Sequence, residues 1–377
     1  MPYWRLSSFY FFYFATLGAL VPYWGLYLKD LGFSEIRIGE LIATIMATKI
    51  IAPNVWGWIA DHTGYRMRII RIASLLAALC FTGVFISSDY WWLVLVMSAF
   101  SFFWNATLPQ FEATTLNHLG SDTQRYSSIR LWGSIGFIVA VSGLGVVFDY
   151  TRISLLPVFL LVLFIIIWVS SLFVPEQDVR HDQVDHVPLW TLLRRREVMA
   201  LIVAAFFLQA SHGPYYSFYS LYLETHGYSR LLIGQLWALG VIAEIVVFML
   251  MYKLLPRFGA RRLFLAALLL TCLRWLLIAV FVDELSVLLF AQLLHAASFG
   301  VIHAVAIHLI HLYFKGRHQG KGQALYSSLS FGAGGAAGSL LGGWLWVASG
   351  PQSMFYTAAV ISLLAWVVAW WGVGRTE

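Results

Sequence analysis

Twelve stretches of mostly apolar residues, each long enough to cross a lipid bilayer, follow one another along this chain of 377 residues. A membrane-spanning helix needs roughly 20 such residues. The stretches are 5–28, 35–60, 69–87, 90–116, 127–148, 152–174, 198–223, 230–253, 261–282, 285–312, 322–347 and 353–373. Only 11% of the residues are charged, against about 25% in soluble domains. The pattern predicts an all-α membrane protein of twelve transmembrane helices embedded in the lipid bilayer.

The sequence of the first half recurs in the second half. Tyr27, Gly32 and Gly64 match Tyr222, Gly227 and Gly259, each 195 positions later. The one long polar connection, 175–197, separates the halves. We therefore predict two six-helix bundles, an N-terminal one over 1–174 and a C-terminal one over 198–377, joined by a linker at 175–197. Parallel repeats with a site near the membrane midplane are typical of transporters.

The distribution of Lys and Arg residues predicts the orientation in the membrane. Seventeen of the 24 lie on the side that holds both termini, four lie on the other side, and three lie within the apolar stretches. Such an excess marks the cytoplasmic side. We expect a multi-pass protein of the bacterial inner membrane with both termini in the cytoplasm. The basic residues form no cluster of the kind that binds nucleic acid, so no nucleic-acid partner is expected.

A short motif follows the second apolar stretch. Gly57, Asp61, Gly64 and Arg66 stand at the spacing Gly-x-x-x-Asp-x-x-Gly-x-Arg. This resembles the loop signature of the major facilitator superfamily, although His62 stands where that family usually has a cation. The resemblance implies the major facilitator fold and a gating role for these four residues. An ordinary turn at the membrane surface is the simpler alternative.

Among the ionisable residues inside the apolar stretches, six form a candidate set. A charge at a helix centre costs about 2.5–3.5 kcal/mol, so such residues are functional candidates by default, and buried structural ion pairs are the alternative. They are Lys49, Glu112, Arg130, Glu244, Arg274 and His295.

This set resembles the lactose-permease branch of the superfamily, and more closely its relatives that carry aromatic acids such as phenylpropionate. In the first half, Glu112 and Arg130 match the acid and arginine of that branch's substrate site, and Lys49 matches a cation of the phenylpropionate group. The resemblance implies a substrate-binding role for all three.

In the second half, Glu244, Arg274 and His295 match an acid, an arginine and a histidine of the same branch. The resemblance implies that Glu244 and Arg274 bind substrate. The branch's proton-carrying acid follows the histidine by one turn, and here that position is Ser298. The proton is therefore assigned to Glu244, His295 or Glu112, because burial disfavours an ionised carboxyl group.

Two further observations concern the substrate. Three fixed cations against two acids leave a charge of +1 within the apolar stretches, which favours an anion. His212 and Tyr216 lie on a polar face of the seventh stretch with Gln209 and Tyr219. We expect His212 and Tyr216 to contact substrate. The alternative is that these side chains only join helices.

The favoured function is proton-coupled symport of a small organic anion, such as an aromatic carboxylate, by alternating access. The partners are then a small solute and a proton, and we expect the protein to act as a monomer. Proton symport of a neutral oligosaccharide or nucleoside is the alternative, and a non-transporting receptor or a membrane enzyme is a further one. We expect no catalytic residues, no metal site and no cofactor, since the intramembrane histidines lack neighbouring carboxylates or thiolates.

Overall fold

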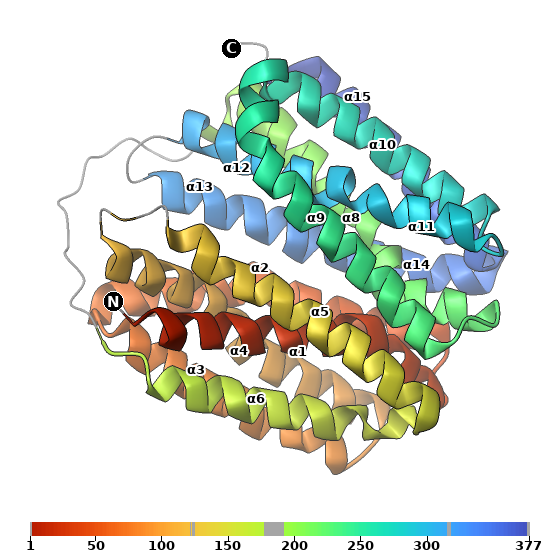
Figure 1. The fold of residues 1–377 in the computed structure, drawn as a ribbon, viewed down its shortest axis with the longest axis horizontal. Helices are drawn as coiled ribbons and strands as arrows, with labels where there is room; N and C mark the ends of the chain where they lie inside the picture. Colours follow the sequence, from red (N-terminus) through yellow and green to blue (C-terminus); the bar gives the residue numbers. More distant parts are fainter. Residues whose placement is uncertain (1, 121, 123–124, 177–191, 315–317, 375–377) are drawn as a thin grey trace. The chain divides into compact units, whose positions relative to one another are not determined.

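The computed structural model describes residues 2–120, 122, 125–176, 192–314 and 318–374, apart from the side chains of Asp61, His318 and Gln319. Every regular element in these residues is a helix (Figure 1). Those of the first half are α1 (Tyr3–Asp30), α2 (Glu35–Thr63), α3 (Arg66–Phe81), η1 (Thr82–Phe85), α4 (Tyr90–Leu119), α5 (Tyr126–Tyr150), η3 (Ile153–Leu155) and α6 (Leu156–Leu172).

The second half contains two short π-helical segments, η4 and η5, within longer helical runs. Its elements are α8 (Arg196–Thr225), α9 (Arg230–Phe258), α10 (Ala260–Val280), α11 (Leu285–Leu293), η4 (Ala296–Val301), α12 (Ile302–Tyr313), α13 (His318–Ser327), η5 (Ser328–Gly334), α14 (Gly335–Ser349) and α15 (Pro351–Gly372).

The predicted all-α membrane fold is confirmed. In the described residues, 11 helical runs are long and apolar enough to cross a membrane. The predicted stretch 322–347 is also helical, because α13, η5 and α14 follow one another from His318 to Ser349. It is less apolar than the others, since glycine and serine replace many of its aliphatic side chains.

The helices form two compact units. The first contains the described residues up to Glu176 together with Tyr228–Ala238, the first turns of α9. The second contains Leu192–Gly227 and the described residues from Leu239 onward. The predicted domain limits at 174 and 198 stay a prediction, and most of the predicted linker lies outside the described residues.

Corresponding helices pack in the same way within each unit. In the first unit α1 packs against α5 and α6, and α3 packs against α4 and α6. In the second unit α8 packs against α14 and α15, and α10 packs against α15 and α12. The internal repeat of the sequence thus has a counterpart in the packing order of the helices.

Glycines bring the first helix of each unit against a partner helix. A Cβ atom at Gly18 of α1 would lie 2.6 Å from the backbone oxygen of Phe137 on α5. A Cβ atom at Gly213 of α8, 195 positions later, would collide with the backbone of Gly338 on α14. Only glycine permits backbones to approach this closely in a helix pair.

Arginines cap the carbonyl end of the last helix of each unit. Arg5 and Arg71 donate hydrogen bonds to the Phe173 and Val174 carbonyls beyond α6, over 3.3 Å and 2.7 Å. In the second unit, Arg196 and Arg261 donate to the carbonyls of Trp371 and Val373 at the end of α15, each over 2.7 Å. The last carbonyls of a helix lack intrahelical donors, so these cations satisfy them.

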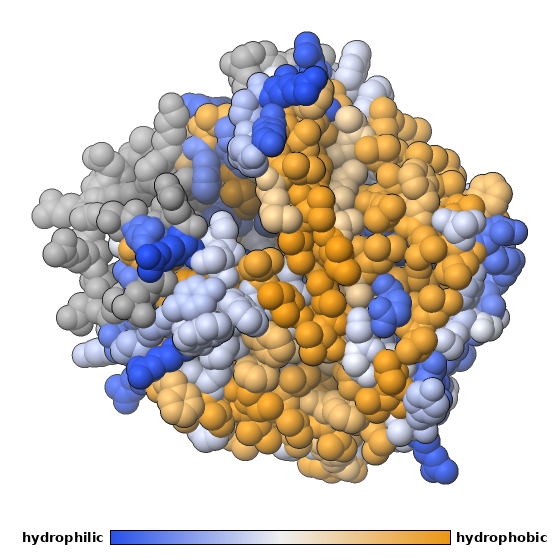
Figure 2. Space-filling view, viewed as in Figure 1, coloured by the Kyte–Doolittle hydropathy of each residue, from blue (hydrophilic) through white to orange (hydrophobic). Residues whose placement is uncertain are grey.

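Large apolar side chains remain exposed on many helices, among them Trp58, Ile86, Leu95 and Tyr150. In the space-filling view, hydrophobic residues cover much of the visible face, and the most hydrophilic residues lie mostly near its edges (Figure 2). Exposed apolar surface on this scale requires lipid as the surrounding solvent.

Candidate functional site

The first unit places Glu112 of α4 beside Arg130 of α5. The Arg130 Nε atom lies 3.8 Å from Glu112 Oε1, and each side chain is 30% exposed. The Arg130 guanidinium also lies over the ring of Phe14, 3.9 Å from its centre. The predicted pair is therefore present, but its long N···O distance leaves both groups able to contact another polar group.

Lys49 of α2 lies half-buried in the same unit. Among the described residues it has no ion pair and no hydrogen-bond partner. The preceding residue, Thr48, belongs to a small polar cluster: it accepts a hydrogen bond from Asn105 over 2.9 Å and lies 2.9 Å from the Ser101 hydroxyl. An intramembrane ammonium group without a counter-ion is costly, so Lys49 is a strong candidate for contact with an anion.

The predicted gating loop connects α2 and α3. Gly64 follows α2 with φ 75°, a left-handed conformation that favours glycine, and Arg66 begins α3. Gly57 lies near Gln110 of α4, whose Nε2 atom would be 3.5 Å from a Cβ atom at Gly57. The side chain of Asp61 lies outside the described part of the structure. Sequence reasoning missed Glu176, whose carboxylate accepts hydrogen bonds from the backbone N–H groups of Met67 and Arg68.

Arg274 of α10 is fully buried in the second unit, and its hydrogen bonds to described residues go to a backbone carbonyl, an amide oxygen, a hydroxyl and an imidazole nitrogen. Its Nε donates to the Ala291 carbonyl over 3.0 Å and its Nη2 to Gln292 Oε1 over 3.2 Å. Its Nη1 donates to Ser298 Oγ over 2.9 Å and to His295 Nδ1 over 3.0 Å. The expectation that Arg274 contacts substrate stays a prediction, but a substrate would have to displace one of these groups to reach it.

Gln292 was not identified from the sequence, although it is a central member of this network. Its side-chain oxygen accepts from Tyr215 over 3.0 Å as well as from Arg274. Its amide nitrogen donates to the Tyr219 hydroxyl over 2.6 Å. The sequence offered one indication, namely that Gln292 is a polar residue within an apolar stretch, three positions before His295.

The structure brings Glu244 of α9 close to His295. Glu244 Oε2 lies 3.7 Å from His295 Nε2, and both side chains are largely buried. Glycines line this contact from both helices. A Cβ atom at Gly240 would lie 3.2 Å from His295 Cδ2, and one at Gly300 would lie 3.5 Å from Glu244 Cγ.

His212 and Tyr216 of α8 lie one turn apart with stacked rings, 5.7 Å between centres. His212 is fully buried, and its Nδ1 donates to the Leu208 carbonyl over 2.9 Å. Tyr216 is half-buried, whereas Tyr219 is fully buried and its hydroxyl accepts a hydrogen bond from the Gln292 amide. The polar face predicted on this helix is therefore directed largely into the packing of the second unit, and only Tyr216 keeps appreciable exposure.

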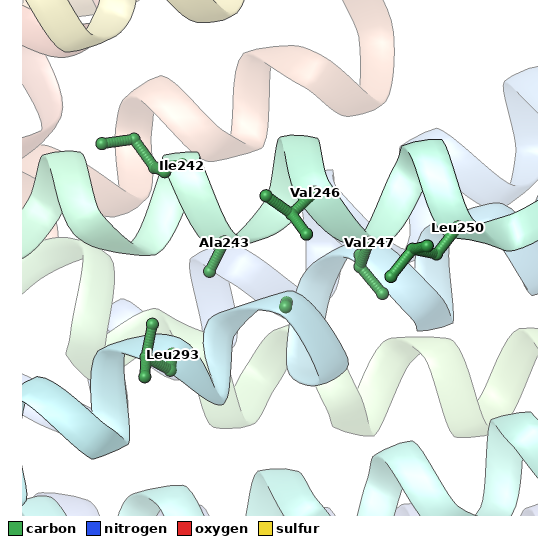
Figure 3. Close-up of a pocket in the computed structure, with 7 residues that line it drawn as sticks. Ile242, Ala243, Val246, Val247, Leu250 and Leu293 are labelled. Atoms are coloured by element: carbon green, nitrogen blue, oxygen red, sulfur yellow. The ribbon is translucent and has the colours of Figure 1, made fainter.

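An open apolar pocket of about 320 Å³ lies between α9 and the helical run that contains α11 and η4. Its lining consists of Ile242, Ala243, Val246, Val247, Leu250, Leu293 and Ala296. In the close-up, Ala243 and Val247 point toward the helix that carries Leu293 (Figure 3). No lining residue is polar, so this pocket offers no partner for a carboxylate. Within the described residues, no group of three or more His, Cys, Asp or Glu side chains could hold a metal ion.

Comparison with known proteins gives relatives over almost the whole chain. The model of the MFS_1 like family matches residues 3–357. A probable 3-phenylpropionic acid transporter from Escherichia coli (strain K12) is 28% identical over 365 residues, which are 94% of each chain. A maltose permease from Geobacillus stearothermophilus is 26% identical over 371 residues, covering 94% of this chain and 91% of the permease.

Solved structures share the fold. The nucleoside transporter NupG superposes with a TM-score of 0.83 at 16% identity, covering 98% of both chains. A mutant of NupG reaches a TM-score of 0.86 at the same identity and coverage. At this identity the likeness concerns the fold alone.

Proposed function

Since this chain belongs to the MFS_1 like family and is a secondary transporter rather than an enzyme, we propose that it couples the uptake of a small organic anion to the inward movement of a proton. The proposed substrate is an aromatic carboxylate of the phenylpropionate type, carried by alternating access across the bacterial inner membrane. Its relative from Escherichia coli, a probable 3-phenylpropionic acid transporter, supports this substrate class.

The observation that carries the proposal is Lys49. Its ammonium group lies half-buried within a membrane-spanning helix and has neither an ion pair nor a hydrogen bond to any described residue. Glu112, the intramembrane acid that the sequence indicated in the first unit, lies beside Arg130 and forms no ion pair with Lys49. A carboxylate from the substrate would supply the missing negative charge.

Arg130 supplies a second contact for the same carboxylate. Its distance of 3.8 Å from Glu112 exceeds that of a good charge-assisted hydrogen bond, about 2.7–2.9 Å. A planar guanidinium can bind a carboxylate through two parallel hydrogen bonds. The helices that carry Lys49 and Arg130 both contact α4, which holds Glu112.

Aromatic side chains surround Arg130 in a way that suits an aromatic ligand. The guanidinium lies 3.9 Å from the centre of the Phe14 ring and 5.5 Å from that of Tyr10. Phe14, Leu17 and Val21 are half-exposed along one face of α1. A ligand with a carboxylate and an apolar ring would match both the cation and this apolar face.

The test is initial uptake of labelled phenylpropionate into proteoliposomes with an imposed inward proton gradient. Protein-free liposomes measure passive diffusion of the undissociated acid, and that rate is subtracted. We expect uptake above this background in the wild type, a large loss in Lys49→Gln and Arg130→Ala, and partial recovery in Lys49→Arg. Lys29→Gln is the matched control, because Lys29 lies at a helix end in an exposed ion pair with Glu35.

Competition separates the proposal from its alternative. Unlabelled carboxylates should inhibit the uptake, whereas maltose, a nucleoside and the neutral amide of phenylpropionate should not. Uptake of maltose or a nucleoside, with no competition by carboxylates, would show that the substrate is neutral and would overturn the proposal.

A further inference from the structure

Three side chains of the second unit form a short chain from a fixed cation to a carboxylate. Arg274 of α10 donates to His295 Nδ1 over 3.0 Å, and His295 Nε2 lies 3.7 Å from Glu244 Oε2 on α9. Ser298 Oγ accepts a second bond from the same Arg274 nitrogen. The imidazole ring therefore lies between the arginine and Glu244.

The contact with Arg274 determines which nitrogen of His295 carries the proton. A guanidinium has only donors and stays charged in proteins. Nδ1, which faces it, must therefore present its lone pair, so the hydrogen of the neutral ring is on Nε2 and points toward Glu244. A doubly protonated ring would place an Nδ1–H group against the guanidinium N–H groups and would lose this bond.

Burial fixes the arrangement. Arg274 is 0% exposed, and its guanidinium lies 4.3 Å from the centre of the Tyr215 ring and 4.7 Å from that of Trp275. Gln292 holds it from a further side and is itself held by two tyrosines. Repulsion by this immobile cation opposes the addition of a second proton to the adjacent imidazole.

Helix geometry keeps Glu244 against the other ring nitrogen. The π-helical segment η4 begins directly after His295, so Gly300, five residues further, returns to the same side of the helix. A Cβ atom at Gly300 would lie only 2.5 Å from Val247 Cγ1, and one at Gly240 would lie 3.2 Å from His295 Cδ2. Each glycine thus lies opposite the ionisable residue of the other helix and lets the two helices approach.

The other ionisable groups around Glu244 are weaker candidates for a proton. Tyr216 of α8 interacts electrostatically with Glu244, and a phenol is neutral at physiological pH. His212 of α8 interacts with His295 but also faces the Arg274 charge. His303, two turns beyond His295, is separated from it by the ring of Phe299, which stacks between them.

We infer that Glu244 is the residue that binds the coupling proton, while His295 stays neutral and directs its Nε2–H group toward the carboxylate, 3.7 Å away. This inference rests on the proposed proton symport. With Glu244 ionised, its charge balances that of Arg274 in the second unit. When the carboxyl group takes a proton from water, the Arg274 charge is left without a counter-charge, which favours arrival of the anionic substrate.

The first experiment measures proton uptake when phenylpropionate binds to the detergent-solubilised full chain in weakly buffered solution. We expect about one proton per bound anion in the wild type and none in Glu244→Gln. His295→Gln should retain the proton uptake, because its amide can accept from Arg274 and direct an N–H group toward Glu244 as the neutral ring does. Loss of proton uptake in His295→Gln, with retention in Glu244→Gln, would overturn the inference.

A second measurement does not depend on the substrate. Infrared difference spectra recorded between acidic and alkaline pH should contain the C=O band of a protonated buried carboxylic acid. We expect this band to disappear in Glu244→Gln and to persist in His295→Gln and Glu112→Gln. A band unchanged in Glu244→Gln would contradict the inference even if phenylpropionate binds, whereas absence of phenylpropionate binding with the expected spectra would contradict only the proposed substrate.

Discussion

The guanidinium carbon of Arg130 lies 3.9 Å from the centre of the Phe14 ring, which covers one face of this cation in the first unit. A cation–π contact contributes about 0.5–1 kcal/mol when exposed. We predict that Phe14→Leu weakens phenylpropionate binding about two- to fivefold, because Arg130 loses the ring that positions it. Binding to the detergent-solubilised protein would measure this change.

Phe14→Tyr should bind almost as tightly as the wild type, since a phenol ring keeps the cation–π contact. Phe11→Leu, one turn earlier on the same half-exposed face of α1, should have no effect. Equal losses in Phe11→Leu and Phe14→Leu would mean that the face needs only aromatic bulk and that the contact with Arg130 does not matter.

Replacement of Gln292 by leucine should destabilise the second unit. The change removes acceptors and a donor from Arg274, Tyr215 and Tyr219, all of them fully buried or nearly so. The net contribution of each hydrogen bond lost is about 0.5–1.5 kcal/mol. We predict a clearly lower thermal unfolding temperature in detergent. Unfolding would be monitored by intrinsic fluorescence or by a thiol-reactive fluorescent probe.

The control for this prediction is Gln323→Leu in α13, where the side chain is exposed. An unfolding temperature close to that of the wild type is expected there. If Gln292→Leu were as stable as the control, the hydrogen bonds around Arg274 would contribute nothing to the fold.

Addition of a methyl group at Gly18 should also destabilise the protein. The new Cβ atom would lie 2.6 Å from the Phe137 backbone oxygen, and a backbone atom cannot move away as a side chain can. Overpacking of this kind costs about 1–3 kcal/mol. The unfolding temperature of Gly18→Ala in detergent would reveal it.

Gly143→Ala on α5 is the matched substitution, because a Cβ atom there meets nothing within 4 Å. Alanine is favoured over glycine in a helix by about 0.5–1 kcal/mol, so this variant should be slightly more stable than the wild type. Similar changes in the two variants would show that α1 and α5 can separate at little cost.

Glu176 is expected to stabilise the beginning of α3. Its two carboxylate oxygens accept the backbone N–H groups of Met67 and Arg68 over 2.8 Å and 3.1 Å. Loss of such a cap costs about 0.5–2 kcal/mol. Glu176→Ala should therefore increase hydrogen exchange of the amides at the start of α3, measured by mass spectrometry.

In Glu176→Gln, one amide oxygen can still accept, while the attraction between the negative charge and the helix terminus is lost. Exchange at the start of α3 should lie between that of the wild type and that of Glu176→Ala. Unchanged exchange in both variants would exclude a capping role.

Much of the fold follows from the sequence, since a run of about 20 apolar residues in a bilayer forms a membrane-spanning helix. The ionisable residues of the site were predictable for the same reason: a charge such as Lys49 or Arg274 is conspicuous in an apolar stretch. The resemblance to a known branch indicated Glu112, Arg130, Glu244, Arg274 and His295 as a set. In the structure Glu112 lies beside Arg130 and Glu244 lies beside His295, while their roles in binding stay predictions.

Other parts of the site could not be derived from the sequence. Gln292 is neutral, and a single sequence does not distinguish a glutamine that binds a buried arginine from one that makes no specific contact. The π-helical turn after His295 has no periodic signal over its 6 residues. The cap at Met67 depends on Glu176, which is 109 positions away, and only the packed helices bring the two together.

The arginines that cap the last helix of each unit have a consequence for synthesis of the chain. Arg5 donates to a carbonyl 168 positions later, and Arg196 donates to one 175 positions later. At about 5–20 residues per second, each arginine is made about 8 to 35 s before its acceptor is synthesised. Each half of the molecule must therefore hold its first helix in the membrane through that interval, and the two halves become complete in turn, one after the other, as translation proceeds.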